Sequence, residues 1–559
     1  MGLFSVLNIG TRGLFASQLA MDVAGQNISN ADVEGYSRKR LNLSPDYRYD
    51  SMFGQMGMGV EVVNIERMRN AFIDQQIQRQ NQEVGYFEEL DYTMESIENI
   101  FTEPSETGLL TFLDQFFDSW QNLSNNPADV SARNMVKTNA EILTDVFHNV
   151  SGELVDLRQT RSEEIEQRVN KVNSICSDIY NLNLEISAVE LSNQNANDSR
   201  DKRDRMLKEL SEIIDINVIE NDMGQVTVTT SGSIVVSPAF WQGLELFPQV
   251  FTLSDGSTRS EVGIRFANSK NVYDPAGGQI KGLLESRDTI IPDYQSQIDE
   301  LALLLAEKVN ELHMQGYNLA GFSGVPFFDE RTTGALDIAI SDAVSSDVRN
   351  IAAASAGEAR PAAQNPLAAG THDFGAAPAQ LYRDPAAAVP VIAQNVIQGT
   401  VIISTPTATL TEGVDYHIDY VNGTVQMLHN GFDAEDLTVD FEYRTGGFQG
   451  PGDNSNAIQL AQLRTELTMT PDVLGDPTVT FAQFYSSTIG VLGLSRNEAD
   501  SNLETRQYLI DQYESHQDSI AGVSLDEEMA NIVKYQHTYQ AAARIISTAD
   551  EMLDVLLNM

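Results

Sequence analysis

The end of the chain carries an apolar pattern that a helix can satisfy only by packing along another helix. Steps of four and three residues alternate from Leu525 to Leu557, which is the spacing of the core positions of a coiled coil. Ser524 precedes this run and Glu527 follows three residues later, so we expect a capping box to start the helix. The seam residues that we expect to meet a partner helix are Met529, Ile532, Tyr539, Ile546, Leu553 and Leu557.

The first thirty residues carry a second seam, in which large and small residues alternate. Leu7, Leu14, Met21 and Ile28 recur every seven residues, and Gly10, Ser17 and Ala24 follow the first three of them by three positions. Small residues let another helix approach closely, and a lone helix of this length is marginal in water. We therefore expect it to be frayed until it meets a partner. Taken alone, each seam also fits an ordinary core helix of a globular protein.

Further helical patterns lie inside the chain. Between Asp129 and Ile214 a helical pattern runs without proline, and a seam from Ile165 to Val189 includes Cys176. This length is typical of a coiled coil, and its position predicts that Cys176 is a buried apolar residue, not a reactive thiol. We interpret the mixed charges of "DSRDKRDR", residues 198–205, as a solvated helix face.

Two stretches have sequence patterns that are typical of β-structure. Val226, Val228, Ile234 and Val236 alternate around Ser231-Gly232, which predicts a hairpin within residues 216–266. After an Ala/Pro-rich segment, Asn422-Gly423 predicts a type I′ turn. Pairing of the strands about that turn places six apolar residues on one face: Val414, Tyr416, Ile418, Tyr420, Val425 and Met427. Residues 437–443 are predicted to add a further strand.

Composition excludes several classes of function. With 35 basic and 80 acidic residues, a net charge of −45, the chain lacks the basic surface that a nucleic-acid-binding protein needs. No apolar run is long enough for membrane insertion, and the N-terminus lacks the features of a cleaved signal peptide. No nucleotide-binding loop, hydrolase elbow or metal-binding histidine spacing occurs. We therefore expect no catalytic residue, metal or cofactor.

Two motifs resemble the axial proteins of the bacterial flagellum, which include rod, hook and hook-associated proteins. The first is "ISNADVEGYSR" after the heptad helix, with Asn27, Ile28, Ser29, Asn30, Gly35 and Tyr36 as the shared positions; the second is the C-terminal "STADEMLDVLLNM". Residues 277–288, 305–328 and 452–457 are similar to the hook-associated protein 1 branch, the first hook–filament junction proteins. The resemblance covers about residues 1–355 and 450–559, so residues 356–450 look like an insertion.

The resemblance implies a non-enzymatic structural protein of α+β multidomain fold. The N- and C-terminal α-helices would pair as a coiled coil lining an inner tube, with Asn30 ending the first helix in a left-handed cap. The implied partners are other copies of the chain in a ring or helical layer, the hook subunit, the second junction protein and an export chaperone on the C-terminal helix. Export would use the flagellar apparatus without a cleaved signal peptide, and the protein would lie extracellularly at the hook–filament junction.

The expected domains follow the changes in pattern. They are the N-terminal axial helix and linker (1–70), a long-helix coiled-coil domain (71–215), a β-rich domain (216–290), a helical return with some β-structure (291–355), the inserted β module (356–450), the return to the helical domain (451–520) and the C-terminal axial helix (521–559). Two alternatives remain: a hook or distal-rod subunit, or an axial scaffold whose inserted module is enzymatic or adhesive.

Overall fold

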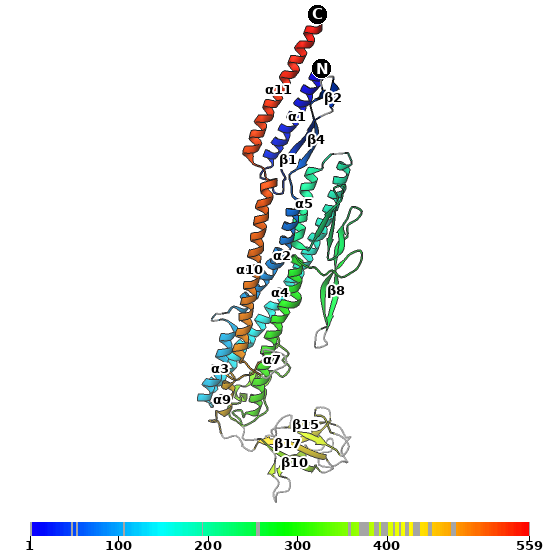
Figure 1. The fold of residues 1–559 in the computed structure, drawn as a ribbon. Helices are drawn as coiled ribbons and strands as arrows, with labels where there is room; N and C mark the ends of the chain where they lie inside the picture. Colours follow the sequence, from blue (N-terminus) through cyan, green and yellow to red (C-terminus); the bar gives the residue numbers. More distant parts are fainter. Residues whose placement is uncertain are drawn as a thin grey trace. The chain divides into compact units, whose positions relative to one another are not determined.

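The structure is a computed structural model of the chain (Figure 1). It describes residues 3–45, 48–51, 54–103, 105, 107–192, 194–252, 258–355, 359–367, 379–384, 391–392, 401–405, 409–412, 415–419, 424–428, 437–444, 450–470 and 477–557. None of the helices in these ranges combines the length and apolarity that crossing a membrane requires.

The chain divides into two compact units, each assembled from separate segments of the sequence. The first comprises residues 1–93, 159–289 and 495–559, and the second comprises residues 94–158 and 290–494. Long helices contribute residues to both units; they are α2 (Ala71–Phe101), α4 (Val130–Glu190) and α10 (Phe481–Ala521).

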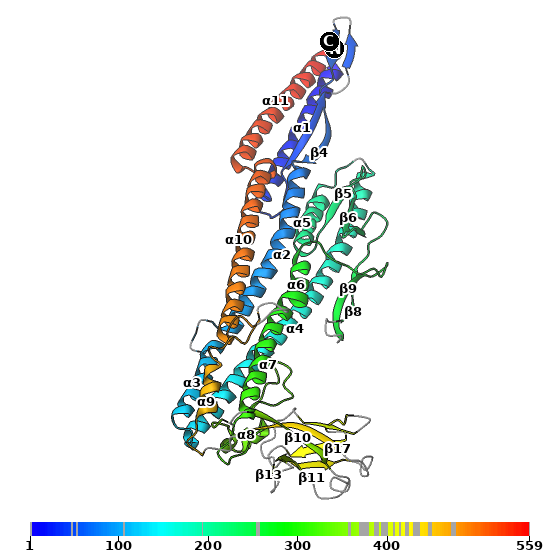
Figure 2. The same cartoon turned by 60° about the horizontal axis from the view of Figure 1, so that its bottom comes forward.

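The first unit brings the two ends of the chain together. Helix α1 (Leu3–Ser29) and helix α11 (Leu525–Leu557) lie side by side in both ribbon views (Figures 1 and 2). Strand β1 (Lys39–Pro45) pairs antiparallel with β4 (Val60–Arg67), and this ribbon packs on α1. Between them, β2 (Arg48–Ser51) and β3 (Gly54–Gly57) form a hairpin.

The rest of the first unit packs β-structure against helices. Helix α5 (Asn197–Ile213) is followed by a three-stranded sheet of β5 (Asn217–Glu220), β6 (Val226–Thr230) and β7 (Ser233–Val236). A hairpin of β8 (Leu244–Thr252) and β9 (Thr258–Phe266) comes next. Helix α6 (Gln279–Glu285) and the π-helical turn η1 (Ser286–Ile290) follow the hairpin. Its core includes the α4 seam from Ile165 to Ile179, and Cys176 is 1% exposed, as the sequence predicts. Burial raises the pKa of the Cys176 thiol to about 12.

The second unit has an aromatic core. Its helices are α3 (Leu109–Asn125), α7 (Ile291–Gln315), α8 (Asp342–Ser346), the 3₁₀ turn η2 (Val348–Asn350) and α9 (Ser455–Gln462). Trp120 and Phe116 of α3 pack against Phe327, with ring centroids 5.4 and 5.9 Å away. All three side chains are fully buried.

Residues 359–444 form a small β module with a core of its own. One sheet has the strand order β10 (Ala359–Leu367), β17 (Leu437–Arg444), β14 (Ile402–Ser404), and a second has the order β11 (Ala379–Gln380), β16 (Thr424–Met427), β15 (Tyr416–Asp419) (Figure 2). A third sheet pairs β12 (Tyr382–Asp384) with β13 (Val391–Ile392). The predicted hairpin forms: Tyr416 pairs with Met427 and Ile418 with Val425, and all four are buried. Val414, Tyr420 and the turn Asn422-Gly423 lie outside the described residues.

Two details of the first unit differ from the sequence prediction. The helical pattern from 129 to 214 is broken after α4, because Asn195 and Asn197 turn their side-chain amides to the carbonyl oxygen of Ile65, 2.9 Å away in each case. In the hairpin, the register shifts between Val228 and Thr229, so Val235 is buried and Ile234 is 39% exposed.

Candidate assembly surface: the paired terminal helices and their joint

The face of α1 that meets α11 is made of small side chains. Buried positions recur along α1 with helical spacing, on the sides that α11 and the β1–β4 ribbon cover; they are Gly10, Ala16, Ser17, Ala20, Val23, Ala24 and Asn27. Because these residues project little, the two helix backbones approach closely and the larger side chains of α11 fill the remaining space.

Gly10 shows how close that approach is. A Cβ atom at this position would lie 2.8 Å from Cγ1 of Ile546, and one at Gly13 would lie 3.6 Å from Cβ of Ala542. Ala542 and Ala549 are the most deeply buried alanines of α11. Glycine and alanine therefore set the separation of the two helices at these levels.

The larger seam residues predicted from sequence are less deeply buried than these small ones. Leu7, Leu14, Met21 and Ile28 of α1 are partly buried, as are Ile532, Tyr539, Ile546 and Leu553 of α11. Met529 is 60% exposed. Leu557 belongs to α11, and its side chain is outside the described part of the chain.

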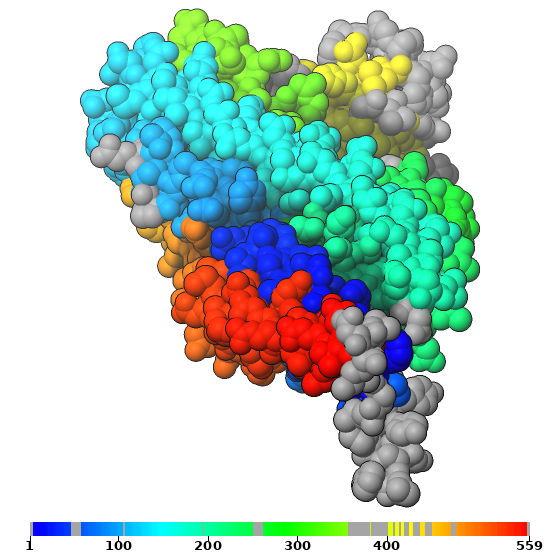
Figure 3. All heavy atoms as spheres, turned by 90° about the horizontal axis from the view of Figure 1, so that it is seen from above, coloured from blue at the N-terminus to red at the C-terminus, as the bar shows by residue number. Residues whose placement is uncertain are grey.

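Helix α11 is also apolar away from α1. Large apolar side chains are exposed on it by 42–61%; they are Leu525, Met529, Val533, Ile545, Met552 and Val555. Figure 3 shows α11 in red beside α1 in blue, with much of the red surface uncovered in that view. A helix that is apolar on most of its circumference is normally enclosed by protein, and large exposed apolar patches mark interaction sites.

A buried polar joint fixes the two helices to the rest of the first unit, and Asn27 is at its centre. The Asn27 amide donates to the carbonyl oxygen of Lys39 (2.9 Å) and to Glu528 Oε2 (3.3 Å). Its Oδ1 accepts from the backbone N–H of Lys39 and from the Tyr36 hydroxyl, each at 2.9 Å. The side chain is 1% exposed, so its polar atoms depend on these partners.

Glu528 belongs to the first turn of α11 and is 3% exposed. Its Oε1 accepts from Nε of Arg38 at 2.8 Å and lies 2.6 Å from Nη2 of that guanidinium. Two nitrogens of one guanidinium thus converge on a single carboxylate oxygen, and charge-assisted hydrogen bonds of this kind are stronger than neutral ones. Burial and the nearby carboxylates of Asp201, Asp198 and Glu528 raise the pKa of Tyr36 to about 12, so its hydroxyl stays a donor.

The other half of the joint is an acidic face of α5. Asp201 accepts from the Ser37 hydroxyl and from Arg67, both at 2.8 Å, while Asp204 pairs with Arg67 at 2.8 Å. Lys39 reaches Asp198 at 2.5 Å. The interpretation of residues 198–205 as a solvated face is wrong, because Asp201 is 8% exposed. The sequence does place acids at every third position, 198, 201 and 204, and in the structure their basic partners are Lys39, Arg67 and Arg69.

The other motif residues lie at the rim of the joint. Helix α1 ends at Ser29, and the Asn30 amide donates to Gln26 O at 2.8 Å on the exposed surface. The expected left-handed cap at Asn30 is wrong, because the positive φ of this turn is at Gly35 (+76°). Ile28 is partly buried and Ser29 is exposed.

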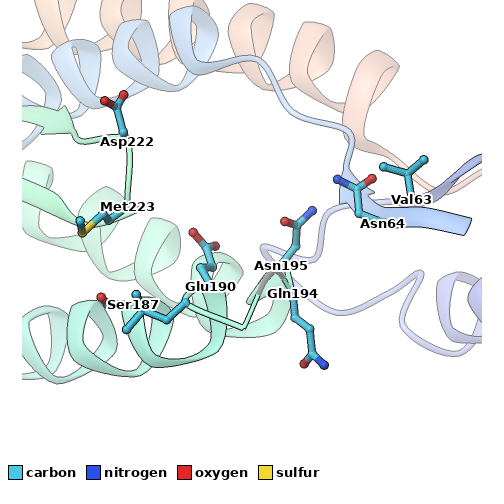
Figure 4. A pocket seen from close by; sticks show the side chains of 9 residues that line it. Val63, Asn64, Ser187, Glu190, Gln194, Asn195, Asp222 and Met223 are labelled. Carbon is cyan, nitrogen blue, oxygen red and sulfur yellow. The ribbon is translucent and has the colours of Figure 1, made fainter.

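The hollows of the first unit do not have the features of a reaction site. One, of about 290 Å³, lies between Val63 and Asn64 of β4, the end of α4 and the turn at Asp222 and Met223 (Figure 4). The Glu190 carboxylate on its wall is held by Arg200 at 2.6 Å. Among the described residues, no group of three histidine, cysteine or acidic side chains is placed to hold a metal ion.

Comparison with protein families gives three separate matches. Residues 94–328 match the model of the flagellar hook-associated protein FlgK helical domain. Residues 7–36, which hold α1 and the motif, match the model of flagella basal body rod proteins. Residues 518–559, which hold α11, match the flagellar basal body rod FlgEFG protein C-terminal model.

Individual relatives cover almost the whole chain. Flagellar hook-associated protein 1 of Bacillus subtilis is 27% identical over 99% of this chain and 98% of the relative. The proteins of the same name from Salmonella typhimurium and Escherichia coli are 26% and 25% identical, over 99% of this chain and 100% of each relative. The chain is thus similar, over nearly its whole length, to proteins named flagellar hook-associated protein 1.

A solved structure shows a similar fold. The flagellar hook junction protein FlgK from Burkholderia pseudomallei superimposes with a TM-score of 0.56 at 18% identity, covering 80% of this chain and 100% of that one. In the first unit, the candidate for a surface that joins subunits is the terminal helix pair with its joint.

Proposed function

We propose that the protein is a structural component of the flagellum that forms the junction between hook and filament. The observation that carries the proposal is the exposed apolar surface of α11, where six large side chains remain 42–61% exposed beside α1. Such a surface gains free energy when neighbouring subunits cover it. If subunits assemble through their paired terminal helices, each subunit added to the layer would gain this free energy.

The proposed partners follow from this surface and from the family. Other copies of the chain would form the ring or helical layer through repeated head-to-tail contacts. The hook subunit would lie on one side and the second junction protein on the other. Before assembly, an export chaperone would cover α11, whose apolar surface would otherwise be open to aggregation.

Export without a cleaved signal peptide is part of the proposal. Supporting it, Gly10, Ser17 and Ala24 lie within the contact between α1 and α11. Removal of a leader of ordinary length would delete this half of the helix pair. Mass spectrometry of the protein in isolated flagella tests this, because an N-terminus beyond residue 10 would contradict it.

The residues 356–450 are proposed to be an accessory module, not a catalytic one. Within the second unit, the chain enters and leaves this segment at one place: the backbone N–H of Ser355 donates to Asp453 at 3.2 Å, and that of Asn456 donates to Ala353 O at 3.1 Å. The module has its own apolar core. Replacing residues 356–450 by a short Gly/Ser linker should leave junctions and filaments intact, and loss of filaments would show that the module is needed for assembly.

The main proposal is tested by Met529→Glu in the bacterium that encodes the protein. The change places a charge on an exposed side chain, so the monomer should fold normally while assembly fails. The expected cells carry hooks without filaments and do not swim. Cells without hooks would indicate a hook or rod subunit instead. Ile219→Glu is the matched control, because Ile219 is 62% exposed on β5, away from the terminal helices, and should leave filaments unchanged.

A further inference from the structure

Five of the six exposed apolar residues of α11 form two separate patches on different sides and at different heights. The N-terminal patch consists of Leu525, Met529 and Val533, and the C-terminal patch consists of Ile545 and Met552. At about 100° per residue, the patches lie about 150° apart around the helix, each roughly 100° from the α1 seam. Met529 and Ile545 are separated by 16 positions, or about 24 Å along the axis.

Each side of α11 is apolar at one height and polar at the other. On the side of the N-terminal patch, but further toward the C-terminus of α11, lie the exposed residues Ser547, Glu551 and Asp554. On the side of the C-terminal patch, but nearer the N-terminus of α11, lie the exposed residues Glu527 and Lys534. Two copies packed side by side at equal height would therefore place apolar side chains against charged ones, which leaves both poorly satisfied.

A parallel copy displaced along the helix removes this mismatch. A shift of 16 to 19 positions places Met529 of one copy beside Ile545 of the next, and Val533 beside Met552; 17 positions correspond to about 26 Å. The same shift brings Asp526 near Arg544, which is 18 positions further along and at the same angle on the helix. Both are exposed, and opposite charges at a rim favour one register over others.

We propose that copies of this chain pack in parallel through α11 with an axial stagger of about 26 Å, the N-terminal patch of one covering the C-terminal patch of the next. The proposal rests on the proposed assembly through the terminal helices and specifies its partner as a second copy of the chain. Because the contact joins two different patches, it is heterologous and repeats from copy to copy as a rising, helical layer.

Cysteine cross-linking in isolated flagella tests the stagger. The single natural cysteine, Cys176, is buried, so the background reaction with a short bismaleimide is low. In Met529→Cys/Ile545→Cys, the two thiols of one chain are about 24 Å apart on a rigid helix, so a short linker joins only different chains. We expect a ladder of covalent multimers from the double variant and monomer from each single variant.

Each other outcome overturns the proposal in a recognisable way. Dimers from Met529→Cys alone would show that copies pack at equal height. Normal junctions without cross-links in any variant would show that neighbours meet through other surfaces, with the proposed function unaffected. Absence of the natural protein from isolated hook–filament junctions would refute the proposed function itself.

A charge exchange gives an independent readout. Asp526→Arg should reduce the number of filaments per cell, and Asp526→Arg/Arg544→Asp should restore it. The matched control is Asp526→Arg/Lys534→Asp, which keeps the same net charge but changes a base about 15 Å away from Arg544 along the axis, and should not restore filaments. Equal rescue by both double variants would show that only net charge matters, and would overturn the assigned register.

Discussion

The side-chain amide of Asn27 lies 3.3 Å from the carboxylate of Glu528, and this contact joins positions 501 residues apart in sequence. Asn27 is in the last turns of α1 and Glu528 is in the first turn of α11. Both side chains are buried. The contact therefore fixes where the C-terminal helix starts relative to the end of the N-terminal one.

Asn27→Ala is expected to loosen this joint. It removes four hydrogen bonds and leaves the backbone of Lys39 and the Tyr36 hydroxyl buried without their partner. Each buried polar group left unsatisfied costs about 1–3 kcal/mol. Hydrogen–deuterium exchange of assembled junctions should show faster exchange in residues 27–39 and at the start of α11.

The control for this prediction comes from the same motif. Asn30→Ala removes one exposed hydrogen bond, to Gln26 O, and should change exchange little. If Asn30→Ala loosened the joint as much as Asn27→Ala, the motif would act through the end of α1 and not through the link to Glu528.

The seam between α1 and α11 should be sensitive to any added volume at Gly10. A Cβ there would meet Ile546 at 2.8 Å, and overpacking of a filled contact costs about 1–3 kcal/mol. Gly10→Ala should therefore lower the dissociation temperature of isolated junctions, and Gly10→Ala/Ile546→Ala should recover part of the loss. Gly25→Ala adds the same methyl group with nothing within 4 Å, so a similar loss there would contradict this explanation.

The acidic face of α5 should be required for the joint. Asp201→Ala leaves Arg67, Ser37 and their buried surroundings without the carboxylate that they share. Leaving a buried charge unpaired costs about 3–5 kcal/mol; because Arg67 keeps Asp204 at 2.8 Å, we expect a smaller loss, which thermal unfolding of the purified protein measures. Glu66→Gln is the control, because its partner Arg40 is 60% exposed and such surface pairs contribute about 0–1 kcal/mol.

The periodic parts of the fold could be predicted from the sequence, and the joint could not. Heptad spacing identified α11 with its Ser524 cap, where the N–H of Glu527 lies 3.4 Å from the Ser524 hydroxyl. It also identified the buried position of Cys176. Such patterns are readable because helix geometry converts spacing directly into a face.

The joint depends on contacts between distant segments, which spacing alone does not specify. Asp201 and Ser37 are 164 residues apart, and a charged run such as 198–205 is solvated in most proteins. Only the folded structure shows that the segments holding Lys39 and Arg67 contact the acidic residues of this run. The break between α4 and α5 was missed for the same reason, since Asn195 and Asn197 find their partner in β4, 130 and 132 residues away.

The second unit contains a buried histidine whose proton is fixed by its neighbours. His313 Nε2 accepts from the backbone N–H of Ala352 at 2.8 Å, so its Nδ1 carries the proton donated to Val325 O at 2.7 Å. Burial lowers the pKa of His313 to about 4, and the nearby Arg133 charge acts in the same direction. Protonation of Nε2 would break the bond to Ala352 and place a second buried charge near Arg133.

This arrangement predicts that acid destabilises the second unit. In the unfolded chain His313 takes up a proton near pH 6.5, whereas in the folded chain it does so only near pH 4. The unfolded state therefore binds more protons between these values, and the free energy of unfolding falls as the pH is lowered through this window, by up to about 3 kcal/mol.

Urea unfolding followed by Trp120 fluorescence measures this effect, since the Trp120 ring lies 6.1 Å from that of His313. Trp241→Phe removes the other tryptophan of the chain, so the signal reports the second unit. In that background His313→Gln should be less stable at pH 7 but should vary less with pH between 6.5 and 4. An unchanged slope in this variant would assign the acid sensitivity to other groups, such as carboxylates that are ionised in the folded state.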